Sequence, residues 1–355
     1  MRSNTLAWAA LRVAAAVLVC SVAFAQSTAS FAQTESNSRG SMLKPQLVTA
    51  FECDSTRCFL AESITADRDG NLYVSLSDWV STCEILRVTP DGKQTKVVAA
   101  FPLDICSNGF LLGVAFDEEN RLHVAAYTWA GPTNPGVYRV NHDGTPTLVL
   151  SLPADSFPNG LAFYRGDMYV SDSYLGAIWK KRPHDGIVAT VPWYLNIPIL
   201  APTGWGANGL AFYQDALYIG VIDAGPDAAG KETGSIVRLP ILPDGSPGVY
   251  EFAAPPDPRL YDVDGFAFDV TGKLWFPTVT GSDGLGGKLG TLDEDGKLRI
   301  LTDSPGWLDY TSMLVFGTTF GTRGTLYLTN GGLNAGHPNV LSINVGVAGM
   351  PLPAR

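Results

Sequence analysis

The sequence has 355 residues, a net charge of −10 and 38 glycines, and its short apolar runs are separated by Gly, Pro, Asn and Asp. The length suffices for a large core, and the runs show no long amphipathic helical period, so the composition predicts an all-β protein. The acidic balance argues against nucleic acid and anionic membranes as partners.

The N-terminus has the pattern of a secretory signal. Arg2 and Arg12 flank a polar start, an apolar run covers residues 13–22, and a small-x-small cleavage site ends at Ala25. The apolar run is too short to span a membrane, so we expect no membrane insertion. Cleavage after residue 25 removes two arginines and no acid, which changes the net charge from −10 to −12. The pattern predicts a secreted or periplasmic protein.

The rest of the chain divides into three parts by composition. Residues 26–44 are rich in Ser, Thr, Gln and Asn and are expected to form a flexible leader. Residues 45–347 are expected to form a single domain, and residues 348–355 a C-terminal tail. The sequence leaves the oligomeric state open.

Four cysteines remain after removal of the signal segment: Cys53, Cys58, Cys83 and Cys106. An even number in an exported chain favours two disulfides, for which three pairings are open. A zinc site is the alternative interpretation. The spacing fits no common zinc pattern, and an oxidising compartment disfavours free thiols, so we expect disulfides.

An internal repeat organises the chain. A turn followed by an apolar, an aromatic and a β-branched residue, as in Asp69-Gly-Asn-Leu-Tyr-Val-Ser75, occurs six times. The repeats are anchored at Leu72, Leu122, Met168, Leu217, Leu274 and Leu326 and are 50, 46, 49, 57 and 52 residues apart. Repeats of this length made of short strands are typical of a β-propeller, so we predict six blades.

Each repeat also has a second half that predicts an outer hairpin. Gly136-Val-Tyr-Arg-Val140, for example, is followed by the tight-turn pair Asp143-Gly144. The blades are therefore expected to have four strands each. The run from Gln46 to Phe51 precedes the first blade, and we expect it to add a strand to the last blade and close the ring.

Polar residues occur at matched positions just before the innermost strands. Counting back nine or ten residues from the anchors gives Glu62, Asn159, Asn208 and Asp264, whereas the second repeat supplies Leu112 or Gly113 and the sixth Thr311 or Ser312. In a propeller the inner strands start at one end of a central channel, so these side chains are expected to share one opening.

Two carboxylates and two amide oxygens suit a hard divalent cation, and calcium fits best. Without a cation, Glu62 and Asp264 would repel each other, and a pKa would rise. The alternative is that each Asn-Gly or Asp-Gly pair is only a turn. That alternative is sufficient for one pair, but four polar residues at matched repeat positions favour the metal.

The sequence resembles the SMP-30/gluconolactonase/LRE-like family, relatives of paraoxonases and diisopropyl-fluorophosphatase. The motifs that carry the resemblance are Ala61-Glu62-Ser63-Ile64, Pro158-Asn159-Gly160-Leu161, Ala207-Asn208-Gly209-Leu210 and Val263-Asp264-Gly265-Phe266. The resemblance implies a metal, usually calcium, held by Glu62, Asn159, Asn208 and Asp264. It also implies hydrolysis of a small-molecule lactone or ester, with Asp264 as the catalytic base.

The second repeat departs from the family pattern. Sugar lactonases of this family usually have a polar Asn-Asp-Gly phrase there, but this chain has Phe110-Leu-Leu-Gly-Val-Ala-Phe116. This segment and Ser171-Asp-Ser-Tyr-Leu-Gly176 are more similar to strictosidine-synthase-type propellers. The departure favours a more apolar lactone or ester over a sugar acid lactone.

The loops that surround the channel opening carry candidate substrate-binding residues. By strand order these are Trp79, Trp129, Tyr174, Ser312 and His337, and all four cysteines fall in the same loops. The alternative for the tryptophans is packing between neighbouring loops, and for His337 simple solvation. No His is placed to complete a Ser-His-Asp triad, and no Gly-x-Ser-x-Gly elbow occurs.

Two functions remain open at this stage. One is a secreted calcium-dependent lactonase or esterase, and the other is a non-catalytic secreted propeller with a structural calcium and a ligand-binding rim. A strictosidine-synthase-like condensation is a third interpretation, but it would not need the full set of four ligands. Because propellers host many functions, the fold does not decide.

Overall fold

The computed structural model describes residues 43–351, except residues 44, 52, 54–57, 79, 132, 281–286, 303–307 and 333–337. The expected signal segment and almost all of the expected leader therefore lie outside the described residues. The compact unit described below begins at Pro45. Within this part of the chain, no helix is long and apolar enough to cross a membrane.

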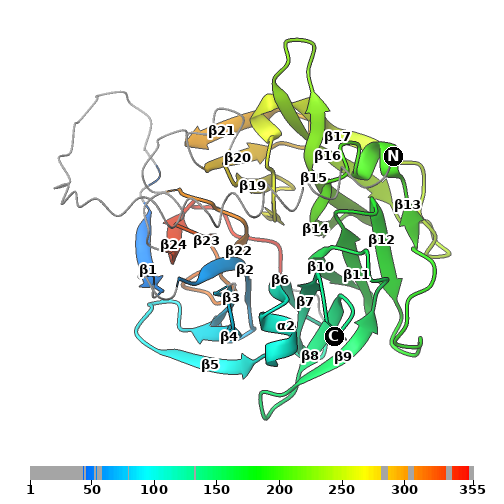
Figure 1. Cartoon of the computed structure of the whole chain (residues 1–355). Helices are drawn as coiled ribbons and strands as arrows, with labels where there is room; N and C mark the ends of the chain where they lie inside the picture. Colours follow the sequence, from blue (N-terminus) through cyan, green and yellow to red (C-terminus); the bar gives the residue numbers. More distant parts are fainter. Residues whose placement is uncertain are drawn as a thin grey trace. The chain divides into compact units, whose positions relative to one another are not determined.

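The described residues form six four-stranded antiparallel sheets, which are the blades of a β-propeller (Figure 1). The predicted fold class is confirmed. The first two blades are β2 (Leu60–Ala66), β3 (Leu72–Ser77), β4 (Cys83–Val88) and β5 (Thr95–Ala100), then β6 (Gly109–Phe116), β7 (Leu122–Thr128), β8 (Gly136–Val140) and β9 (Pro146–Ser151). The third blade is β10 (Pro158–Tyr164), β11 (Asp167–Asp172), β12 (Ala177–Lys181) and β13 (Tyr194–Leu195).

The remaining blades follow the same order. The fourth blade is β14 (Ala207–Tyr213), β15 (Ala216–Pro226), β16 (Glu232–Pro240) and β17 (Glu251–Asp257), and the fifth is β18 (Ala267–Phe268), β19 (Leu274–Thr278), β20 (Lys288–Leu292) and β21 (Leu298–Thr302). The sixth contains β22 (Leu314–Phe316), β23 (Thr325–Asn330) and β24 (Asn339–Asn344). Within the described residues, three short helical segments connect strands: α2 (Leu103–Cys106), α3 (Ile197–Leu200) and η1 (Pro258–Leu260).

The sixth blade is completed by the start of the unit. Strand β1 (Gln46–Ala50) pairs antiparallel with β24, with Gln46 opposite Ser342. The predicted closure of the ring is therefore confirmed. After β24 the chain continues to pair: the Met350 N–H donates to the Phe268 carbonyl at 2.9 Å. The described part of the expected tail thus packs on the fifth blade.

The repeated Leu-Tyr-Val phrase has a packing explanation, because alternate residues of a strand point to opposite faces. Leu72 and Val74 are fully buried in a cluster shared with Tyr327 of the preceding blade. Tyr73 points the other way, and its ring meets Phe116 of the next blade at 4.9 Å. Both faces of a blade are thus covered by neighbours, which is why the phrase is apolar throughout.

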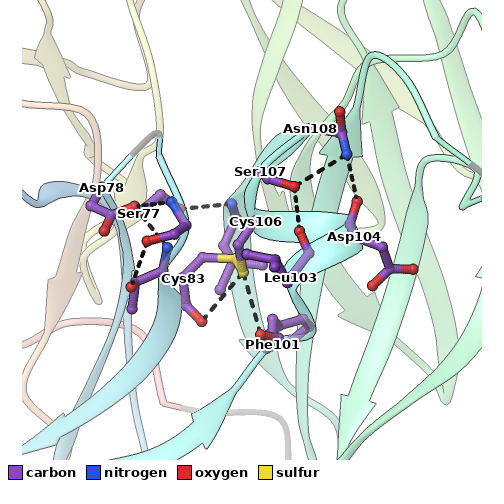
Figure 2. The surroundings of a disulfide bond; sticks show 12 residues. Ser77, Asp78, Cys83, Phe101, Leu103, Asp104, Cys106, Ser107 and Asn108 are labelled. Carbon is purple, nitrogen blue, oxygen red and sulfur yellow. Dashed lines mark hydrogen bonds between the residues drawn. A yellow bond between two sulfur atoms is a disulfide. The ribbon is translucent and has the colours of Figure 1, made fainter.

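Two disulfides are present in the described part of the chain and settle the pairing that the sequence left open. Cys53 pairs with Cys58 between β1 and β2, and Cys83 in β4 pairs with Cys106 at the end of α2. Figure 2 shows the second bridge, which joins the first blade to the segment that leads into the second. The expectation of two disulfides is confirmed.

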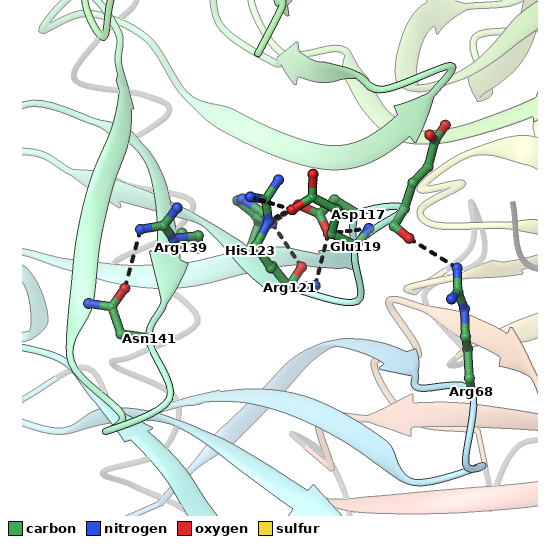
Figure 3. Close-up of polar contacts among 8 residues, drawn as sticks. Arg68, Asp117, Glu119, Arg121, His123, Arg139 and Asn141 are labelled. Carbon is green, nitrogen blue, oxygen red and sulfur yellow. Dashed lines mark hydrogen bonds and ion pairs between the residues drawn. The ribbon is translucent and has the colours of Figure 1, made fainter. Parts of the chain in front are cut away.

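Aspartates stabilise several of the turns that follow the inner strands, at the end of each strand opposite to the pocket. Figure 3 shows Asp117, whose carboxylate accepts the N–H groups of Glu119 at 2.9 Å and Arg121 at 2.8 Å and pairs with the Arg121 guanidinium at 2.6 Å. Nearby, burial lowers the pKa of His123 to about 4, and its Nδ1 lies 3.0 Å from the Arg121 carbonyl oxygen. These groups stabilise the turn.

Candidate active site

A pocket lies where the inner strands begin, and side chains from all six blades line it. Glu62, Asn159, Asn208 and Asp264 are all in its wall. The structure therefore brings together the four residues that the repeat positions singled out. The other lining residues are Ser63, Gly113, Val114, Gly160, Leu161, Gly209, Leu210, Gly265 and Met313.

Three of the four side chains, those of Glu62, Asn159 and Asn208, sit in an irregularity of their inner strand, and Asp264 lies before β18, directly after the isolated bridge between Val263 and Thr278. The pairing register shifts between Ala61 and Ser63 in β2 and between Ala207 and Leu210 in β14, with the same shift around Asn159 in β10. A β-bulge adds a residue to one strand and re-aims its side chain, and such bulges are common beside active sites. The bulges explain how strand residues direct polar groups into the channel.

The glycine that follows three of these residues allows the inner strands to approach one another closely. A Cβ at Gly160 would lie 2.3 Å from the Asn208 carbonyl oxygen, and one at Gly209 would lie 2.4 Å from that of Asp264. Neither glycine has a positive φ. The Asn-Gly pairs are therefore not turns, and the glycines are there because a side chain would separate adjacent blades at the pocket.

Buried hydroxyl groups hold the bulges in place from the second strand of the blade. Ser171 Oγ accepts the Gly160 N–H at 2.7 Å and donates to the Asn208 carbonyl of the next blade. Ser75 and Thr329 occupy the matching positions of the first and sixth blades and bond to backbone in the same way. The pocket residues are thereby fixed by contacts within and between blades.

The pKa values of both pocket carboxyl groups are raised. Asp264 is only 7 % exposed. Burial raises the pKa of Asp264 well above its usual value, and the charges of Glu62 and Asp262 raise it further, against the opposing hydrogen bonds from the Gly265 N–H and the Asn208 side chain. Burial also raises the pKa of Glu62 to about 7. A bound cation would relieve both effects.

The amide groups give an independent test of whether a cation fits. Asn208 Oδ1 is buried and has no hydrogen-bond partner among the described residues. Leaving such an oxygen unpaired costs about 1–3 kcal/mol unless a ligand or an ion satisfies it. The Asn159 side-chain nitrogen donates to Ser173 Oγ at 3.2 Å, which fixes the orientation of that amide.

The donor chemistry is consistent with a hard cation. No group of three or more His, Cys, Asp or Glu side chains suited to a metal occurs in the described part of the chain. The pocket instead offers two carboxylates and two amides, and all-oxygen sets of this kind suit calcium. The residues present therefore fit the ion that the resemblance implies.

The candidate substrate-binding residues of the rim differ in position and exposure. Trp79 and His337 lie outside the described residues. Trp129 follows β7 and is 49 % exposed, and Tyr174 follows β11 and is half-buried. Ser312 is 1 % exposed and its hydroxyl donates to the Glu62 carbonyl, so its geometry supports positioning of Glu62.

Three further residues near the pocket were not found by sequence reasoning. Met313 lines the pocket, and burial together with the charges of Glu62, Asp264 and Asp262 raises the pKa of Tyr310. Tyr310 and Asp262 both have a positive φ, near 60°. The sixth blade lacks the polar-Gly phrase, so the repeat gave no signal for Tyr310 and Met313.

Comparison with known proteins identifies the fold. No protein-family model and no curated protein matches the sequence. Among solved structures, regucalcin from Agrobacterium tumefaciens, described as a calcium-binding protein, has a TM-score of 0.58 at 16 % identity, covering 88 % of this chain and 97 % of its own.

Two further structures have the same fold. One is described as a "putative gluconolactonase" (TM-score 0.53, 19 % identity, 88 % of this chain and 96 % of its own). The other is a luciferin-regenerating enzyme (TM-score 0.52, 14 % identity, 83 % and 94 %). These similarities show a shared propeller fold with the kinds of protein that the sequence resembles.

Proposed function

We propose that this chain is an exported, calcium-dependent hydrolase that opens a lactone or a related ester at the central pocket. The observation that carries the proposal is the pair of pocket carboxylates, the partly buried Glu62 and the buried Asp264, beside the unpartnered amide oxygen of Asn208. Both carboxylates have raised pKa values, and the Asn208 oxygen has no hydrogen-bond partner among the described residues, which is expected of a site that binds an ion.

The four polar side chains would hold the calcium ion through oxygen atoms, with the two carboxylates balancing its charge. When bound, the ion would supply Lewis-acid chemistry, which polarises a substrate carbonyl and lowers the pKa of an attacking water. The backbone contacts from Ser171 and Ser312 keep Asn208 and Glu62 in place during the reaction.

Asp264 would act as the base. Its carboxylate accepts a proton as the water oxygen forms a bond to the acyl carbon. The bond between that carbon and the ring oxygen then breaks, and the proton passes to the departing oxygen. With the ion bound, the Asp264 carboxylate would stay ionised at neutral pH, so that it is available to accept the proton.

Export is supported by the two disulfides, since such bonds persist in oxidising compartments. Together with the N-terminal signal pattern, they favour a periplasmic or extracellular enzyme acting on a small molecule.

The test is hydrolysis of a panel of aromatic, aliphatic and sugar lactones, each with excess calcium and with chelator. Turnover that chelator abolishes and calcium restores is the expected result. If calorimetry shows calcium binding but no lactone or ester is hydrolysed, the non-catalytic propeller with a structural ion and a ligand-binding rim is the better explanation.

A further inference from the structure

Six aromatic side chains form one continuous cluster beside the pocket, which we call the aromatic platform: Phe110, Tyr127, Trp129, Phe157, Tyr174 and Trp205. They come from the second blade, the third blade and the segment that leads into the fourth. The ring centroid of Phe157 lies 4.3 Å from that of Tyr127, 4.9 Å from that of Tyr174 and 4.5 Å from that of Trp205. Phe157 is therefore the centre of the platform.

The platform has a buried base and an exposed edge. Phe110 and Phe157 are 5 % and 2 % exposed, whereas Trp129 is 49 % exposed. The Trp129 ring contacts Phe110 at 6.3 Å and Tyr127 at 6.2 Å. An indole that is supported from below and open above offers an apolar surface to a ligand.

The platform is linked to the pocket through Leu112, which precedes the pocket-lining Gly113. Leu112 packs with Phe110 and Phe157 in one buried cluster, and it occupies the position in the second blade that Asn159 and Asn208 hold in the next two. On the other side, Ser173 precedes Tyr174 and accepts a hydrogen bond from the Asn159 side chain. The platform thus begins where the polar ligand set ends.

The platform is also held rigidly. The backbone N–H of Trp129 donates to the Asn108 carbonyl at 2.8 Å, and Asn108 follows the α2 segment that the Cys83–Cys106 disulfide anchors (Figure 2). On the third blade, the Asp172 carboxylate accepts the backbone N–H groups of Phe157 at 3.0 Å and Tyr174 at 3.2 Å. A surface fixed in this way loses little entropy when a ligand binds.

The chemistry of the platform is apolar. Its members carry no charge, and the hydroxyl groups of Tyr127 and Tyr174 hydrogen-bond to each other. A polyhydroxylated substrate would find few free partners there, and Leu112 replaces the amide found in the next two blades. The acidic groups Glu62, Asp262 and Asp264 belong to the first and fifth blades.

We propose that the aromatic platform binds an apolar, preferably aryl, substituent of the substrate while the reacting carbonyl lies over the polar set. This inference rests on the proposed function, because it assigns the substrate class of the same site. It predicts that aryl-substituted lactones are preferred to unsubstituted or polyhydroxylated ones.

The first test compares kcat/KM for a γ-phenyl-substituted butyrolactone and for unsubstituted γ-butyrolactone. Trp129→Ala should lower the ratio of the two values about tenfold, mainly through KM of the phenyl substrate, and Trp129→Phe should retain most of the preference. Phe320→Ala is the matched control, since Phe320 is an aromatic residue 96 % exposed outside the platform. An unchanged ratio in Trp129→Ala would overturn the proposal.

The second test separates this inference from the proposed function. Binding of the corresponding phenyl-substituted lactam is measured by calorimetry with the Asp264→Asn variant in chelator. Binding that Trp129→Ala weakens about tenfold and Phe320→Ala does not would support the platform even if no lactone is hydrolysed. Active wild-type enzyme with no lactam binding would refute the platform and leave the hydrolase intact.

Discussion

Carboxylates occur at both ends of the inner strands, and their hydrogen bonding and pKa values differ between the two ends. At the turn end, Asp269 is 1 % exposed and accepts hydrogen bonds from Thr271, Lys273 and the Trp275 indole. At the pocket end, Asp264 is nearly as buried, yet its pKa is raised well above its usual value. The turn carboxylate is satisfied by its hydrogen bonds, whereas at the pocket carboxylate burial and the neighbouring charges outweigh the hydrogen bonds that it accepts. This difference fits a structural role for Asp269 and the ligand and base roles that we propose for Asp264.

The largest effect should come from removing the charge at each end in turn. Asp264→Asn should reduce lactone turnover by about 10³-fold while the protein stays folded, because the base is lost and one charge repulsion disappears. Asp269→Asn, the matched control, should destabilise the protein by about 2–4 kcal/mol but keep its activity per folded molecule. Kinetics and denaturant unfolding measure the two effects.

Equal losses of activity in both variants, after correction for folding, would contradict the distinction between the two ends.

A second expected effect is a pH-dependent loss of stability when the ion is removed. A carboxyl group with a raised pKa is stabilised in its protonated form, so stability is present below the unfolded pKa of 4.5 and is lost as the pH rises to about 7. For Glu62 the loss is about 2–3 kcal/mol in chelator. Unfolding in chelator and in calcium, at pH 5 and pH 8, measures it.

Calcium should restore this stability at pH 8 and have a smaller effect at pH 5, where the ligands are protonated. Glu62→Gln provides the control, because it should lack both the pH-dependent loss and the recovery. A wild-type protein whose stability in chelator is the same as that of Glu62→Gln at both pH values would argue against the raised pKa.

A third comparison concerns the glycines of the pocket. Gly209→Ala should destabilise the protein by about 1–3 kcal/mol, because its Cβ would lie 2.4 Å from the Asp264 carbonyl oxygen. Gly186→Ala is the control, since nothing lies within 4 Å of that Cβ. Thermal unfolding and calcium affinity should both change in the first variant only. If both variants had the same unfolding temperature and calcium affinity, the close approach of adjacent inner strands would not explain the glycine at position 209.

The smallest effect is expected from the hydroxyl that supports the pocket. Ser171→Ala removes two buried hydrogen bonds and should destabilise the protein by about 1–2 kcal/mol, with a modest loss of calcium affinity. Ser246→Ala removes an exposed hydroxyl that bonds to Asp244 at 2.6 Å and should have almost no effect. If Ser171→Ala left the calcium affinity unchanged, Ser171 would stabilise the fold without positioning the calcium ligands.

The repeat made much of this architecture predictable. The Leu-Tyr-Val phrase packs against both neighbouring blades, so its six copies report six blades directly. Counting back from the anchors found Glu62, Asn159, Asn208 and Asp264 because one strand and one turn separate each from its anchor. The closing strand β1 was predictable because an extra apolar run preceded the first complete repeat.

Other features have no periodic signal. Met313 lines the pocket and Tyr310 lies near its carboxylates, but their blade lacks the polar-Gly phrase. The aromatic platform combines strand and loop residues of the second blade, the third blade and the segment that leads into the fourth, with no common spacing. The bulges around Asn159 and Asn208 depend on pairing with the second strand, and the cysteine pairing depends on distances in three dimensions. These features require the folded backbone.

The pairing of β1 with β24 has a consequence for how the protein is made. Gln46 is synthesised early and must remain unpaired until Ser342, 296 residues later, has emerged. Contacts of such long sequence separation form slowly, and an exposed strand edge invites association with other chains in the meantime. Ring closure should therefore be the last and most aggregation-sensitive step of folding, so truncation before β24 should yield chains that associate with one another.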